Sequence, residues 1–63
     1  MEVRLVNLWN EEARDVPTLA KRVDRENAEV ERLLEEGWRV AAMGPASSAY
    51  AARLTLCREN GDA

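Results

Sequence analysis

Few side chains in this sequence could attack a substrate. Ser47 and Ser48 are paired hydroxyls, and Cys57 is the single thiol of the chain. A serine nucleophile needs a neighbouring base, and the sequence contains no histidine that could act as one. We therefore interpret the two serines as turn residues and Cys57 as a small packing residue of a strand.

Acidic pairs offer a second kind of chemistry, at Glu11 with Glu12 and at Glu35 with Glu36. Two carboxylates catalyse acid–base reactions when burial keeps one protonated and the other ionised, whereas both of these pairs flank expected loops. One cysteine without histidine cannot form a structural zinc site, and the three glycines are too scattered for a phosphate-binding loop. The sequence predicts no catalytic residue, no metal and no cofactor, and hence a non-enzymatic protein.

Arginine is the remaining chemical signal, since it supplies all but one of the nine basic residues. Arg4, Arg39 and Arg53 fall on expected strands, and guanidinium groups bind phosphate or carboxylate through paired hydrogen bonds. The net charge of −3 opposes non-specific attraction to nucleic acid. These arginines form either an anion-binding patch or part of a protein interface.

Hydrophobic periodicity predicts the elements that position these residues. Residues 2–9 alternate between charged and apolar and are expected to form a strand, followed by a polar loop over residues 10–15. A helical stripe then begins at Pro17 or at Asp24, and we favour one helix that is interrupted or bent near Asp24. Asn27 lies where this stripe should be apolar.

The end of the helix carries the clearest local signal. Gly37 can adopt the left-handed conformation of a Schellman cap, which would fold Trp38 back onto Leu33. Residues 38–43 and 49–58 then alternate as two strands, and residues 44–48 have the composition of a hairpin turn. Residues 59–63 form a polar tail.

These elements predict one α+β domain over residues 1–63, a two-layer β-α-β-β fold with a three-stranded sheet and one helix on one face. A core this small needs further stabilisation, and neither a disulfide nor a metal can supply it. We therefore expect a homo-oligomer, a dimer or larger, in which the uncovered sheet face meets a partner. The predicted uncovered face consists of Arg4, Val6, Leu8, Arg39, Ala41, Met43 and Arg53.

The role that fits such a face best is protein interaction, with the chain itself or with another protein, because interfaces favour arginine and methionine. The alternative is a binder of small anions or nucleic acid that uses the arginine patch, although aromatic platforms for bases are scarce. No apolar run could cross a membrane or serve as a signal peptide, and a lone thiol suits a reducing compartment. The expected location is the cytoplasm.

The junction Leu33-x-x-Glu36-Gly37-Trp38 resembles that of short uncharacterised bacterial and phage proteins with a β-α-β-β order. Those proteins also end in an apolar–basic run, here residues 54–58, but have a shorter connection than residues 10–23. The resemblance implies the fold and a phage-related origin, and it carries no catalytic residue. A weaker similarity is to dodecins, small flavin-binding β-α-β-β shells, although the sequence lacks a matching ligand motif.

Overall fold

A computed structural model describes residues 1–59 of the chain. Its elements in chain order are β1 (Glu2–Trp9), the 3₁₀ helix η1 (Glu11–Asp15), α1 (Ala20–Glu35), β2 (Arg39–Pro45) and β3 (Ala51–Arg58). The α+β class and the order of one helix and three strands are confirmed, while η1 replaces the expected loop. Residues 60–63 of the predicted tail lie outside the described residues.

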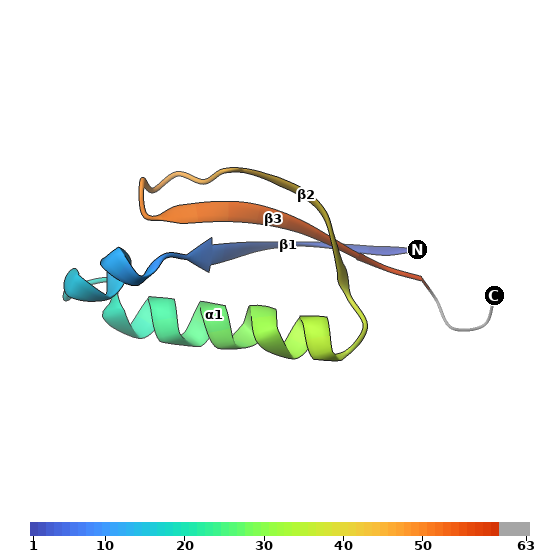
Figure 1. The fold of residues 1–63 in the computed structure, drawn as a ribbon, viewed down its shortest axis with the longest axis horizontal. Coiled ribbons are helices and arrows are strands. Elements are labelled where there is room, and N and C mark those ends of the chain that lie inside the picture. The colour runs from blue at the N-terminus through green and yellow to red at the C-terminus, as the bar shows by residue number, and fades with distance from the viewer. Residues whose placement is uncertain (60–63) are drawn as a thin grey trace.

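The three strands form one antiparallel sheet in the order β1-β3-β2. β3 is therefore central, and β1 and β2 are edge strands. Figure 1 shows α1 running along β1, on the side of β1 away from β3. The last strand thus lies between the first strand and the second and pairs with both.

The start of α1 differs from both predicted positions. The carbonyl of Val16 accepts hydrogen bonds from the N–H groups of Leu19 (2.9 Å) and Ala20 (3.1 Å), which closes a turn after Pro17 before the helix begins at Ala20. α1 then continues through Asp24 to Glu35 as one helix. Asp24 is therefore not a cap but a residue within the helix, and its carboxylate pairs with Arg14 at 3.3 Å.

The predicted Schellman cap is confirmed. Gly37 has a φ of 98°, and its N–H donates to the carbonyl of Leu34 at 3.2 Å. The N–H of Trp38 donates to the carbonyl of Leu33 at 3.1 Å, and the two side chains pack in one buried cluster. This cap turns the chain directly from α1 into β2.

Asn27 joins α1 to the edge of β1. Its Oδ1 accepts from the backbone N–H of Trp9 at 2.8 Å, and its Nδ2 donates to the carbonyl of Trp9 at 2.9 Å. A neighbouring strand would make the same two bonds in a ladder, so the amide side chain takes the place of a strand at this position. This explains a polar residue within the apolar stripe of the helix.

Two apolar clusters attach α1 to the sheet. Near the start of the helix, Val23 packs with Trp9 and Ala13. The second cluster lies near its end and consists of Val30, Leu33, Trp38, Leu54 and Leu56, with Val6 packed against it. Because these contacts are concentrated along β1 and β3, the outer strand β2 receives little cover from the helix.

A bulge interrupts the pairing of β2 with β3 between Val40 and Ala42. The backbone N–H and C=O of Trp9 bond to Asn27 and therefore point away from β3. Backbone groups of successive residues point to alternate sides in an antiparallel ladder, so the register with β3 can be followed from β1 to β2. It assigns the hydrogen bonds between β2 and β3 to Arg39, Ala42 and Gly44. Pro45 is then on the outer edge, where its missing N–H leaves no ladder bond unmade. The bulge and the proline make this edge a poor template for another strand.

Candidate interaction surface

The two sides of the sheet follow from the strand register, because directly paired residues share a side. Leu54 pairs with Val6, and Leu56 with Arg4, so these residues share the side that the end of α1 covers. We call the opposite side the open face. Its residues on the three strands are Val3, Leu5, Asn7, Trp9, Arg39, Ala42, Gly44, Ala51, Arg53, Thr55 and Cys57. At one end of this side Trp9 and Ala51 are covered, because they pack with Ala13 and Val23.

The β1 half of the open face is apolar and exposed. Val3 and Leu5 are 59% and 61% exposed, and they are paired with Cys57 and Thr55 of β3. These two side chains therefore form an apolar surface that stays in contact with water when the chain is alone.

The β2 half of the open face carries the charge. Arg39 lies at the start of β2, while Arg53 of β3 is paired with Gly44, which has no side chain and open space above its Cα. The side chain of Arg53 therefore has no neighbouring side chain at its paired position on β2. The result is an apolar area with a basic margin.

The open face contains no carboxylate within the strands that form it. Arg39 and Arg53 also make no ion pair with any residue in 1–59, whereas Arg4 on the other side binds Glu29 at 2.9 Å. An unpaired guanidinium on an apolar surface is free to bind an anionic group of another molecule.

The predicted face was correct for Arg39 and Arg53 and wrong for the three residues of β1. Arg4, Val6 and Leu8 lie on the helix-covered side, since they pair with Leu56, Leu54 and Ala52. The prediction relied on the alternation of charged and apolar residues in β1. Because β1 has apolar residues on both sides, the sequence alone does not say which side faces the helix.

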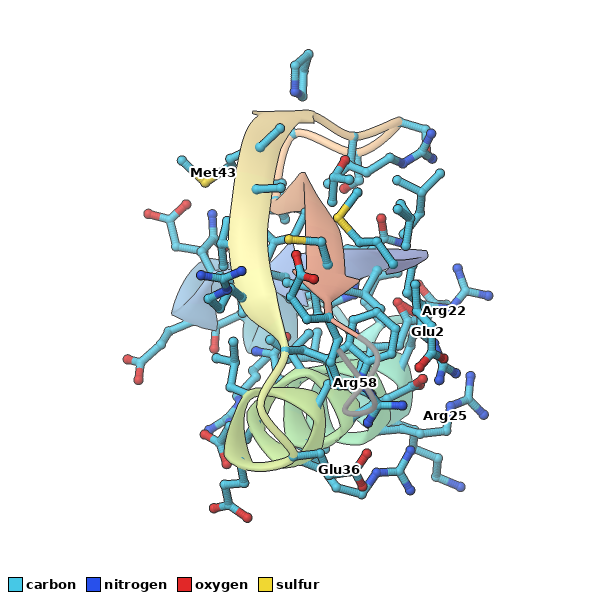
Figure 2. The ribbon with its side chains drawn as sticks, turned by 90° about the vertical axis from the view of Figure 1, so that its right-hand side faces the viewer. Glu2, Arg22, Arg25, Glu36, Met43 and Arg58 are labelled. Atoms are coloured by element: carbon cyan, nitrogen blue, oxygen red, sulfur yellow. The ribbon has the colours of Figure 1, made fainter. Side chains whose placement is uncertain are left out.

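The prediction was also wrong for the middle of β2. Met43 pairs with Leu54 and so shares its side, although it remains 70% exposed. Figure 2 shows its side chain beside β2, at the outer edge of the sheet. Ala41 lies in the bulge and has no direct partner on β3. The extra residue shifts the alternation by one, which places Ala42 rather than Ala41 on the open face.

Sequence reasoning missed Glu26. Its Oε1 accepts from the indole Nε1 of Trp9 at 2.9 Å and from Nδ2 of Asn7 at 3.4 Å, at the edge of β1 that runs along α1. The sole signal in the sequence was a charged residue beside Asn27 on the apolar stripe. Both polar residues hold the helix against the edge of β1.

A metal-binding cluster or a ligand groove would be the other kinds of candidate site. No group of three or more metal-ligating side chains is present in residues 1–59. A groove of about 330 Å³ between β1 and α1 is lined mainly by charged side chains, but Arg4 and Glu29 within it neutralise each other. No helix in the described part of the chain is long and apolar enough to span a bilayer.

No family model, curated protein or solved structure matches this chain. The strongest guide to the role of the protein is therefore the geometry of the open face.

Proposed function

We propose that this protein is a non-enzymatic interaction module that associates with further copies of itself through the open face. One observation supports this most strongly: Val3 and Leu5 are each about 60% exposed side by side on a face bordered by unpaired arginines. Interfaces combine an apolar centre with a polar rim in which arginine is enriched. The resemblance to phage proteins, and the cytoplasmic location, remain predictions.

The size of the open face predicts weak association. Three strands about 4.8 Å apart and strand segments of about 20 Å offer a surface well below the roughly 800 Å² per partner of a standard interface. Contact through this face alone should therefore depend on protein concentration. Sedimentation equilibrium over a range of concentrations from about 10 μM to about 1 mM would detect such a self-association.

Replacing Leu5 by lysine tests the location of the contact. Leu5→Lys places a positive charge on the apolar half of the open face, which has none, and we expect the association constant to fall at least tenfold. Met43→Lys is the matched control, because Met43 is similarly accessible but lies on the other side of the sheet. Equal loss in both variants, or a wild-type chain that stays monomeric at the highest concentration, would refute the proposal.

An anion or nucleic-acid binder is the alternative function, and the absence of carboxylates on the strands of the open face favours it. Arg4 no longer belongs to this patch, because it pairs with Glu29 on the other side. Only Arg39 and Arg53 remain, which is a small basic surface for a phosphate backbone.

Fluorescence anisotropy with a labelled single-stranded oligonucleotide at low salt distinguishes the two functions. Binding that disappears in the double variant Arg39→Glu, Arg53→Glu would support the alternative. If the wild-type protein leaves the anisotropy unchanged at about 100 μM, the alternative is rejected and the self-association proposal is unaffected.

A further inference from the structure

The structure also indicates which surface of a second copy meets the open face. Resting on the proposed self-association, we infer that the open face of one copy binds the flank of α1 formed by Glu31, Leu34 and Glu35 of another. We call these three residues the acidic flank. The contact is therefore between two different surfaces and not between two open faces.

The acidic flank follows from helical spacing. Glu31 and Glu35 are one turn apart, about 6 Å along the helix axis, so they lie on the same flank of α1. Leu34 is adjacent to both and is 44% exposed, although its neighbour Leu33 is buried. The flank thus presents an exposed apolar side chain beside two carboxylates.

Glu35 is unfavourable in the single chain. It lies in the last turn of α1, where the helix dipole opposes negative charge. Glu36, which has the same disadvantage, is partly compensated by Arg32 at 3.9 Å, but within residues 1–59 neither Glu35 nor Glu31 has an ion-pair partner. A cation from another copy would remove this disadvantage.

The open face carries the complementary groups. It offers exposed Val3 and Leu5 for contact with Leu34, and unpaired Arg39 and Arg53 for the two carboxylates. Two open faces in contact would instead bring four unpaired arginines together with no carboxylate on the strands between them. Charge complementarity therefore favours the acidic flank as the occupant.

Charge reversal on each surface tests this inference. One variant carries Arg39→Glu and Arg53→Glu, and the other carries Glu31→Arg and Glu35→Arg. Each variant alone places like charges on both contacting surfaces, so we expect its association constant to fall at least tenfold. An equimolar mixture restores opposite charges at every contact and should recover association in sedimentation equilibrium.

Two controls keep the outcomes distinct. Far-UV circular dichroism establishes that both variants are folded, and reversal of Glu11 and Glu12, which are exposed on η1 outside both surfaces, should leave the association constant unchanged within about twofold. If the Glu31→Arg, Glu35→Arg variant associates like wild type, or if the mixture fails to recover, the acidic flank is excluded while self-association stands. A monomeric wild type would instead refute the proposed function itself.

Discussion

The two tryptophans differ in how their indole N–H groups are satisfied, although both are 7% exposed. Trp9 donates to the carboxylate of Glu26. Trp38 has no acceptor for its buried Nε1 among residues 1–59, and its ring instead lies under the guanidinium of Arg58, 4.8 Å from the ring centroid. Arg58 is held there by an ion pair with Glu2 at 2.8 Å, which Figure 2 shows beside it.

Replacing each tryptophan by phenylalanine should separate these two environments. Trp9→Phe removes a hydrogen bond to a half-buried carboxylate and should lower the free energy of unfolding by about 1–2 kcal/mol beyond the loss of ring area. Trp38→Phe removes a donor that makes no bond, so only ring area and part of the cation–π contact are lost. Urea denaturation followed by circular dichroism should therefore rank Trp9→Phe as the more damaging change, and the reverse order would contradict this account.

Asn27 shows what the sequence could and could not indicate for a single residue. Its position on the apolar stripe was visible as an anomaly, but its partner was not, because the partner is the backbone of Trp9 and carries no side-chain signal. The same limit applies to Glu26, whose bond to Trp9 depends on where β1 lies relative to the helix. Long-range contacts of this kind require the fold to be known first.

At the scale of elements, local signals predicted the structure well where one short segment determines it. The Schellman cap depends on a few consecutive residues, and β1 was predicted with its observed bounds. The bulge in β2 and the side of β1 that faces the helix depend on pairing with β3, a strand later in the sequence. This is why the three strands were predicted within two residues of their observed bounds, while four candidate surface residues were assigned to the wrong side. These four are Arg4, Val6, Leu8 and Met43.

The glycine at the end of α1 has a conformational role that can be measured. Gly37→Ala should lower the free energy of unfolding by about 1–2 kcal/mol, because alanine is strained at a φ of 98°, while no atom lies within 4 Å of the added Cβ. Gly44→Ala is the control, since the same space is open there and its φ is not positive. Thermal denaturation that shows equal effects in both variants would disprove the role of the cap.

At the scale of the whole molecule, the placement of α1 along β1 leaves apolar side chains accessible on both sides of the sheet. Val3 and Leu5 are exposed on the open face. On the other side of the sheet, Val40 and Met43 of β2 are 51% and 70% exposed. A single helix is too narrow to cover three strands when it packs mainly against one edge. The chain thus has more apolar surface than its own elements can bury.

Salt should weaken the proposed assembly, because its rim consists of arginine–glutamate pairs at partly exposed positions. Raising sodium chloride from about 50 mM to about 500 mM shortens the Debye length to roughly 4 Å, and we expect the dissociation constant to rise severalfold. Sedimentation equilibrium at both salt concentrations measures the change. An association constant that stays the same or increases would mean that apolar contact alone drives assembly, without the arginines.

The edges of the sheet have a consequence for how this chain behaves when it is concentrated. The amide of Asn27 occupies the ladder position beside Trp9, while the bulge and Pro45 disturb the outer edge of β2. Cross-β fibres elongate on a long, regular strand edge, whereas α1 runs along the border of β1 and the border of β2 is irregular (Figure 1). Both borders therefore oppose amyloid growth in a chain that has accessible apolar surface, and any association at high concentration should involve folded subunits.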